Sequence, residues 1–110
     1  MEFKRGQIYR VNLEPSQGSE QQGNARPCMI LSITPFNQQF RTLGVVPLSS
    51  TARVYVPVSV AAPSAGLTSV ALCYQLRTID KTRIGKYMGD VSASDLLAIE
   101  NGVRQVYGLG

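Results

Sequence analysis

The chain has 110 residues, the size of one domain, and 44% of them are hydrophobic, which predicts a folded core rather than disorder. Its formal net charge is +4, and it contains no histidine. The absence of imidazole groups excludes Ser-His-Asp triads, Cys-His nucleophile pairs and histidine-ligated zinc sites. We therefore expect a single domain over residues 1–110, in which any chemistry uses other side chains.

The two cysteines, Cys28 and Cys73, lie in short apolar segments and lack the C-x-x-C spacing of a metal site. We interpret them as buried free thiols. No segment approaches the ~20 consecutive apolar residues of a membrane span, and residues 1–6 contain no apolar stretch of signal-peptide length. The sequence therefore predicts a soluble cytoplasmic protein with no metal site and no cofactor.

The charges are distributed unevenly along the chain. No acidic residue lies between Glu20 and Asp80, whereas the same stretch contains Arg26, Arg41, Arg53 and Arg77. Such a stretch indicates either a polyanionic partner, such as nucleic acid or an acidic protein, or scattered arginines on a solvated surface. Charge alone leaves both interpretations open.

The first strand is expected over residues 7–13, where alternating side chains give the period of two typical of a half-buried strand. Gly6 interrupts the chain just before it. Residues 14–26 are polar, rich in Gly, Ser and Gln, and without apolar periodicity, which predicts a loop. A loop this long in a small domain is often functional.

Apolar runs predict the remaining strands over residues 28–33, 42–48, 54–60, 69–74 and 76–79. Polar residues, Pro and Gly predict turns at 34–37 and 49–51 and a loop at 61–66. In the 54–60 run valines alternate with other residues, but Pro57 assigns that strand to an edge of the sheet. No strand is predicted between residues 80 and 91.

One amphipathic helix follows. Ser92 fits an N-cap, Asp95 lies three residues later as in a capping box, and Gly108 supplies the end. The apolar face at helical spacing consists of Leu96, Ile99, Val103, Val106 and Tyr107. Gly102 inside this helix costs ~1 kcal/mol relative to Ala, for no reason visible in the sequence. Five or six short strands followed by one helix predict a mostly antiparallel barrel or sandwich with the helix packed on it.

Several motifs, in this order, resemble those of the MazF/PemK family of bacterial toxins. They are RGQIY at 5–9, LEP at 13–15, GSEQ at 18–21, GNARP at 23–27, FN at 36–37, VPLSS at 46–50, QLRTID at 75–80 and IGKYMG at 84–89. No single motif is specific, but the ordered set covers nearly the whole chain. We therefore identify a resemblance to this family.

The resemblance implies an SH3-like small barrel of the CcdB/MazF type with a C-terminal helix, which is usually a homodimer. It also implies a metal-independent endoribonuclease that cleaves single-stranded RNA at short sequences and is neutralised by an antitoxin. The same fold serves a gyrase-poisoning toxin, so fold alone does not determine the target. A non-catalytic toxin that binds a protein and a nucleic-acid-binding module without chemistry remain as alternatives.

RNA can be cleaved without histidine or metal when its own 2′-hydroxyl attacks the phosphate and the protein stabilises the extra negative charge. Arg26 matches the family's catalytic arginine before Pro, and a guanidinium suits phosphate oxygens. Ser49 stands where the family commonly has Thr, and its hydroxyl provides a hydrogen-bond donor. Ser50 or Thr51, assigned to substrate binding, are alternatives for that hydroxyl.

Glu20 matches the family's loop glutamate and is the third catalytic candidate, either as a base for the 2′-OH proton or as a residue that positions Arg26. Gln21, Gln75 and Arg77 are assigned to substrate binding; Gln75 is equally consistent with a buried structural amide. An acidic antitoxin is expected, because an acidic segment can block a basic RNA groove.

The sequence departs from the PemK branch of the family at two positions. That branch has an Arg and an Asp around its CDQ motif, where this chain has Leu72 and Tyr74. An Asp-based general base is therefore missing at that position, and Tyr74 either stacks on a base or packs in the fold. Residues 55–71 carry no charge and are a weak candidate for a dimer or antitoxin surface.

Overall fold

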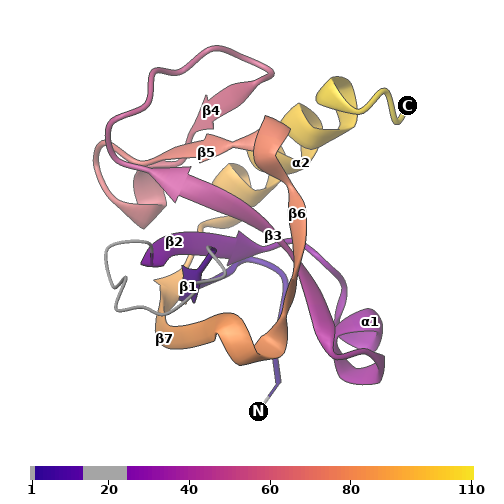
Figure 1. Cartoon of the computed structure of the whole chain (residues 1–110). Helices are drawn as coiled ribbons and strands as arrows, with labels where there is room; N and C mark the ends of the chain where they lie inside the picture. The colour runs from indigo at the N-terminus through magenta and orange to yellow at the C-terminus, as the bar shows by residue number, and fades with distance from the viewer. Residues whose placement is uncertain (1, 14–24) are drawn as a thin grey trace.

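The computed structural model describes residues 2–13 and 25–110 and consists mainly of antiparallel strands followed by a helix, as predicted (Figure 1). The strands are β1 (Gln7–Asn12), β2 (Ala25–Ile30), β3 (Thr42–Ser49), β4 (Ser59–Ala61), β5 (Val70–Leu72), β6 (Arg77–Asp80) and β7 (Ile84–Asp90). The α-helices are α1 (Thr34–Gln39) and α2 (Ala93–Val106), and short 3₁₀ turns are η2 (Pro63–Ala65), η3 (Cys73–Gln75) and η4 (Lys81–Arg83).

The strands pair in the order β4-β5-β3-β2-β1-β7, and β6 pairs with β3 (Figure 1). Strand β3 belongs to two sheets, because its first half pairs with β6 and its end pairs with β5. Strands β6 and β7 lie at opposite margins of one curved sheet and are joined by η4. Among the described strands these margins do not pair, so the sheet is not closed and the expected barrel stays a prediction.

Two predicted elements were wrong in type. The expected turn at 34–37 is the helix α1, in which Pro35 occupies the first turn, where its missing N–H costs nothing. Within α1, the buried Asn37 donates through Nδ2 to the carbonyls of Phe3 and Ser32, both at 2.9 Å. These contacts fix the short helix against the N-terminal segment.

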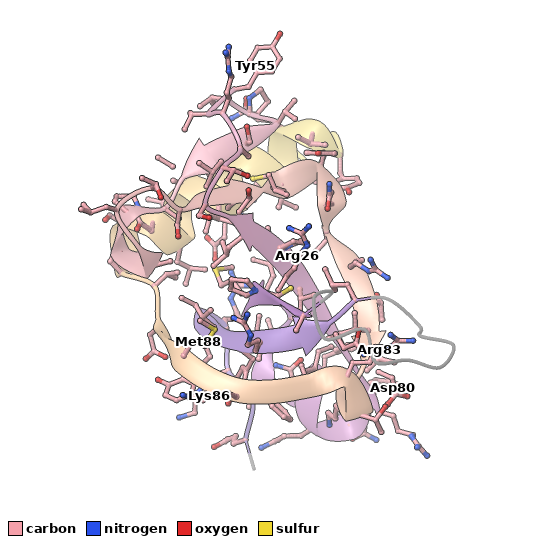
Figure 2. The ribbon with its side chains drawn as sticks, turned by 60° about the vertical axis from the view of Figure 1, so that its left-hand side comes forward. Arg26, Tyr55, Asp80, Arg83, Lys86 and Met88 are labelled. Carbon is pink, nitrogen blue, oxygen red and sulfur yellow. The ribbon has the colours of Figure 1, made fainter. Side chains whose placement is uncertain are left out.

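The expected strand at 54–60 is also interrupted. Residues 56–58 form a turn around Pro57, and the polypeptide pairs with itself through Tyr55 and Ser59, with Tyr55 exposed at the tip (Figure 2). Only the short β4 remains, and its edge position is confirmed. Proline lacks an N–H and fixes φ, so it ended the strand rather than only placing it at an edge. The strand expected at 69–74 is likewise shorter, because η3 replaces its end.

Strand β7 was missed entirely. It contains Gly85 and Gly89, and its pairing with β1 shifts register twice, so it lacks the alternation that reveals a strand. Strand β2 also begins within the expected loop, at Ala25, and ends at Ile30. The ends of β1, β3 and β6 differ from the predicted ends by one residue.

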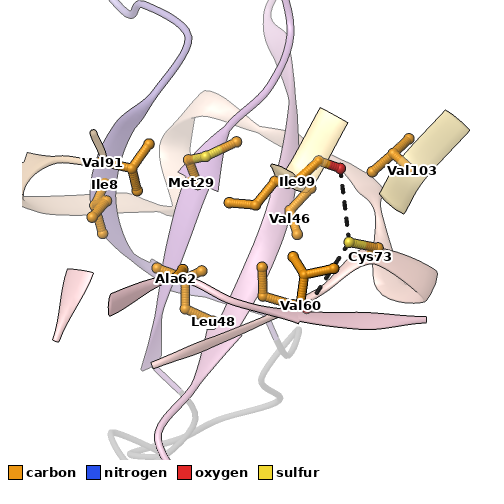
Figure 3. Close-up of a cluster of buried hydrophobic side chains, with 11 residues drawn as sticks. Ile8, Met29, Val46, Leu48, Val60, Ala62, Cys73, Val91, Ile99 and Val103 are labelled. Atoms are coloured by element: carbon orange, nitrogen blue, oxygen red, sulfur yellow. Dashed lines mark hydrogen bonds between the residues drawn. The ribbon is translucent and has the colours of Figure 1, made fainter. Parts of the chain in front are cut away.

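The core consists of two apolar clusters on opposite faces of the sheet. The helix-side cluster lies between the sheet and α2 and contains Ile8, Met29, Val46, Leu48, Val60, Ala62, Ala71, Cys73, Val91, Ile99 and Val103 (Figure 3). The inner cluster fills the concave face and contains Tyr9, Val11, Leu13, Cys28, Ile30, Leu43, Val45 and Ile79. Both cysteines are buried and free, as predicted.

Helix α2 begins as predicted, with Ser92 Oγ accepting a hydrogen bond from the Asp95 amide at 3.1 Å. The structure also explains Gly102. A Cβ at that position would lie 2.6 Å from Cys73 Sγ and 3.0 Å from the Pro57 carbonyl oxygen. The glycine therefore allows α2 to approach η3 closely. None of the helices in the described ranges is both long and apolar enough to cross a membrane.

Candidate active site at the ends of β2 and β3

Strand register brings Arg26 and Ser49 together. Cys28 of β2 pairs with Pro47 of β3 in an antiparallel ladder, so two residues further along each strand Arg26 lies opposite Ser49. Arg26 also pairs with Val11 of the inner cluster. Because paired residues share a face and alternate residues return to it, both side chains lie at the rim of the inner cluster.

A pocket of about 350 Å³ opens at these strand ends. Its lining consists of Ala25, Arg26, Pro27, Leu48, Ser49, Ser50, Thr51 and Ser69. It thus collects four residues predicted from the sequence and adds Ser69, which comes into place because Val70 of β5 pairs with Ser49. That pairing has no signal in the sequence near Ser69.

The Arg26 side chain is exposed and points from β2 into the space beneath β3 (Figure 2). It makes no hydrogen bond or ion pair with residues 2–13 or 25–110. A guanidinium exposed in this way binds anionic oxygens through its paired N–H donors.

The Ser49 hydroxyl is oriented by the turn that follows it. Its Oγ accepts hydrogen bonds from the amides of Thr51 and Ala52, both at 3.1 Å. These bonds use the oxygen's two acceptor sites, which leaves the O–H as a donor. Thr51 Oγ1 lies 3.4 Å away and is the other hydroxyl of the turn, while Ser50 is exposed beside it. The predicted turn at 49–51 thus fixes the position of the Ser49 oxygen at the pocket.

Cys28 is buried beneath the rim of the inner cluster, and its thiol is unreactive. Burial raises the pKa of its thiol to about 12, and the positive charges of Arg77 and Arg26 lower it by less. A thiol with this pKa is not a nucleophile at neutral pH. The opposing effects show that both guanidinium groups act on the same buried position.

Arg77 and Gln75 do not line the pocket. Arg77 pairs with Val45 at the inner face, and its Nη2 donates to the Leu13 carbonyl oxygen at 3.3 Å. Gln75 is exposed on η3, where its Nε2 donates to Tyr74 Oη at 2.9 Å, so it is not a buried amide. Tyr74 is half exposed, and its carbonyl accepts from Tyr107 Oη at 3.1 Å. Leu72 ends β5.

The remaining two predicted residues, Glu20 and Gln21, lie outside the described residues. Within the described ranges, no three Asp, Glu or Cys side chains are grouped closely enough to hold a metal ion. The chemical groups that the pocket presents are therefore one guanidinium and several hydroxyls, a set that binds anionic oxygens.

Comparisons with known proteins find similarity over nearly the whole chain. A family model described as PemK-like, MazF-like toxin of type II toxin–antitoxin system matches residues 4–107. The chain is 34% identical over 111 residues to Endoribonuclease MazF9 of Mycobacterium tuberculosis, with 93% of each chain covered. A match to Endoribonuclease toxin ChpB of Escherichia coli is 48% identical over 48 residues and spans 44% of this chain and 40% of that protein.

Solved structures give the same result for the fold. An endoribonuclease in complex with its cognate antitoxin, from a mycobacterial species, has a TM-score of 0.81 at 29% identity, with 97% of this chain and 96% of that chain covered. A MazF from Deinococcus radiodurans has a TM-score of 0.82 at 24% identity, with 99% of each chain covered. The family match over nearly the whole length and the shared fold show that this chain belongs to the PemK-like, MazF-like toxins of type II toxin–antitoxin systems.

Proposed function

We propose that the protein is an endoribonuclease toxin that cleaves single-stranded RNA at short sequences without a metal ion. The observation that carries the proposal is the Arg26–Ser49 pair: an arginine with no described partner and a hydroxyl whose oxygen is held by two backbone amides line the same pocket. The relatives named endoribonucleases support the assignment.

In the proposed reaction the 2′-oxygen of the substrate attacks the adjacent phosphorus, and the bond from phosphorus to the 5′-oxygen breaks. The products are a 2′,3′-cyclic phosphate and a 5′-hydroxyl, because the attacking oxygen loses a proton and the leaving oxygen gains one. Arg26 donates to the phosphate oxygens as their negative charge increases, and the Ser49 O–H supplies one further donor. Glu20 is proposed either to take the 2′-OH proton or to position Arg26.

Neighbouring residues are proposed to bind the rest of the substrate. Ser50 and Thr51 lie on the rim of the pocket and are placed to contact the nucleotides beside the cleaved bond. Gln21, Gln75 and Arg77 are proposed to contact RNA further from it. Arg77 lies on the face that also carries Arg26, which supports its role more directly than that of exposed Gln75.

We also propose that an acidic antitoxin neutralises the protein in the cytoplasm and that the toxin is a homodimer. One solved relative is described as a complex with its cognate antitoxin. The acid-free stretch between Glu20 and Asp80 includes the pocket arginine, so an acidic segment would compete with RNA there. Sedimentation of the free protein tests the dimer, and sedimentation with the antitoxin tests the complex.

The decisive experiment incubates the protein with a long single-stranded RNA in EDTA and maps the cut ends. We expect cleavage at a short recurring sequence, with 2′,3′-cyclic phosphate ends, and no cleavage where the target nucleotide lacks its 2′-OH. Growth arrest with intact RNA would overturn the proposal in favour of a protein target such as gyrase. Salt-dependent RNA binding without products would instead indicate a binding module.

A further inference from the structure

A second concave region lies where β7 crosses β1, and none of the predicted site residues belongs to it. It is a groove of about 770 Å³ lined by Arg10, Lys86, Tyr87, Met88 and Gly89. The described residues of the lining provide two cationic side chains and an exposed aromatic ring, and none of them carries a carboxylate. We call this region the β1–β7 groove.

Two register shifts form the groove. Tyr9 pairs with Tyr87 but Val11 pairs with Ile84, so one residue of β1, Arg10, faces two residues of β7. A second register shift lies between the Tyr9–Tyr87 pair and the Ile8–Gly89 pair. Bulges of this kind bend a strand and redirect its side chains. They place Arg10 and Lys86 beside each other at the open margin of the sheet.

The groove lies beside the Arg26 pocket. Arg10 pairs with Pro27 across β1 and β2, and Pro27 lines the pocket. Paired side chains in antiparallel strands have Cβ atoms roughly 5 Å apart, so the two concave regions adjoin at this pair. Because Arg10 alternates with Val11 and Pro27 with Arg26, the Arg10 and Arg26 side chains leave the sheet on opposite faces. In Figure 2, Lys86 and Met88 lie along β7 and Arg26 lies nearer the centre of the view.

The side chains of the groove suit a single nucleic-acid strand. Arg10 and Lys86 are exposed and provide two positive charges for phosphates. Tyr87 also lines the groove, is 49% exposed and is held in place, because its ring packs against Tyr9 with centroids 5.4 Å apart and its hydroxyl donates to Asp90 Oδ1 at 2.7 Å. That hydrogen bond raises the pKa of Tyr87, so the phenol stays neutral beside RNA. Fixed aromatic rings between cations are typical of proteins that bind single strands.

We propose that the β1–β7 groove is an RNA-binding track that holds nucleotides flanking the cleaved bond, with Arg10 and Lys86 on phosphates and Tyr87 under a base. This inference rests on the proposed function, since it extends the same substrate beyond the pocket. An acidic protein segment would also meet the two cations. RNA is favoured because Arg10 of the groove pairs with Pro27 of the Arg26 pocket and because the groove presents an aromatic ring.

The test measures binding of two RNAs whose cleavage site carries a 2′-deoxy nucleotide, one of minimal length and one extended at both ends. The variants are Arg10→Gln with Lys86→Gln, and Tyr87→Leu. The matched control is Lys4→Gln with Arg104→Gln, which removes the same charge from exposed positions elsewhere. Affinity is measured at several KCl concentrations.

We expect the double groove variant to bind the long RNA about tenfold more weakly at low salt, with a loss of about twofold or less on the short RNA. The slope of log affinity against log salt should fall by roughly 1.4, since each phosphate contact on a single strand contributes about 0.7. Tyr87→Leu should weaken long-RNA binding about fivefold without changing the slope. The control should bind both RNAs like the natural protein.

Equal losses in the control and groove variants, or no loss on the long RNA, would overturn the groove assignment. So would intact RNA binding together with weakened binding of an acidic antitoxin peptide, which would assign the groove to that protein. Binding does not require cleavage, so the two proposals fail separately. Weaker binding by the groove variants, together with no cleavage by the natural protein of RNA that keeps its 2′-OH, would refute the endoribonuclease proposal. Cleavage by the natural protein, together with unchanged binding by the groove variants, would refute the groove proposal.

Discussion

The two apolar clusters share one sheet but end differently. The helix-side cluster is covered by α2, which approaches so closely that only a glycine fits at position 102. Among the described residues, no helix covers the inner cluster where β2 and β3 end, and there its rim carries Arg26 and Ser49. Both clusters use similar aliphatic residues, so the difference lies in what covers each end. The helix-side face of the sheet supplies stability, whereas the inner face presents polar groups at the rim of its buried apolar residues.

The largest effect expected from this difference concerns Cys28, which is one of the buried residues of the inner cluster. With its pKa raised from 9.0 to about 12 by burial, the native thiol should react with iodoacetamide at pH 8 about 1000-fold more slowly than in denaturant. The folded state binds this proton more tightly, so the resulting stability is complete below about pH 9 and is lost as the pH rises towards 12.

Mass mapping of alkylated peptides over time measures this protection. Cys73 provides an internal comparison, because burial also raises the pKa of its thiol beneath α2. Rapid alkylation of Cys28 alone in the native protein would show that the inner cluster opens at the pocket, and it would contradict the protection of this thiol by burial.

Arg26→Ala should reduce RNA cleavage by roughly 100- to 1000-fold, the effect typical of removing one transition-state donor. Because the side chain is exposed, the free energy of unfolding should change by no more than about 0.5 kcal/mol. Single-turnover cleavage and urea unfolding measure the two quantities. The cleavage activity of Arg26→Lys should lie between those of the natural protein and Arg26→Ala, since lysine keeps the charge but loses the paired donors. Full cleavage by Arg26→Ala would refute the site.

Gly102→Ala tests the closed end. The added Cβ would overlap Cys73 Sγ, and we expect a loss of about 1–2 kcal/mol in unfolding free energy despite the better helix propensity of Ala. Asn101→Ala, at the exposed neighbouring position, is the control and should change stability by no more than about 0.5 kcal/mol. Combining Gly102→Ala with Cys73→Ala should recover part of the loss, and strict additivity would argue against this contact.

Ser49→Ala should reduce cleavage about tenfold, the smallest of these effects, since it removes one donor to a charged group. Ser49→Thr, which restores the residue common in the family, should retain activity. Cleavage rates of Ser50→Ala and Thr51→Ala, measured in parallel, identify which hydroxyl acts. A larger loss in either of those variants than in Ser49→Ala would transfer the donor role to that residue.

The sequence predicted the elements whose signals are local. Alternation revealed β1, and Ser92 with the apolar face of α2 revealed the helix. Strand β7 was missed because bulges and glycines erase its period, and Pro57 broke a strand whose valines suggested continuity. These failures have different causes, since tertiary pairing with register shifts overrides the local pattern in β7, whereas Pro57 ends its strand locally through its missing N–H and fixed φ.

The site was predictable to a similar degree. Family motifs identified Arg26 and Ser49, but nothing local states that they lie opposite each other, because that follows from the Cys28–Pro47 register. Arg10 lies in none of the motifs, Lys86 lies in the IGKYMG motif without an assigned role, and their proximity depends on a bulge in a strand that was not predicted. Residues recognised by motif and residues brought together by register are thus found by different means.

Strand β3 carries one further consequence. It is hydrogen-bonded to β2 on one side and to β6 and β5 in turn on the other, so its end cannot fray without breaking two sheets. Amide hydrogens between Val45 and Leu48 should therefore exchange only when the whole domain unfolds. A site anchored this firmly has no inactive form reached by local melting, so we expect control of the protein to come from a molecule that covers it.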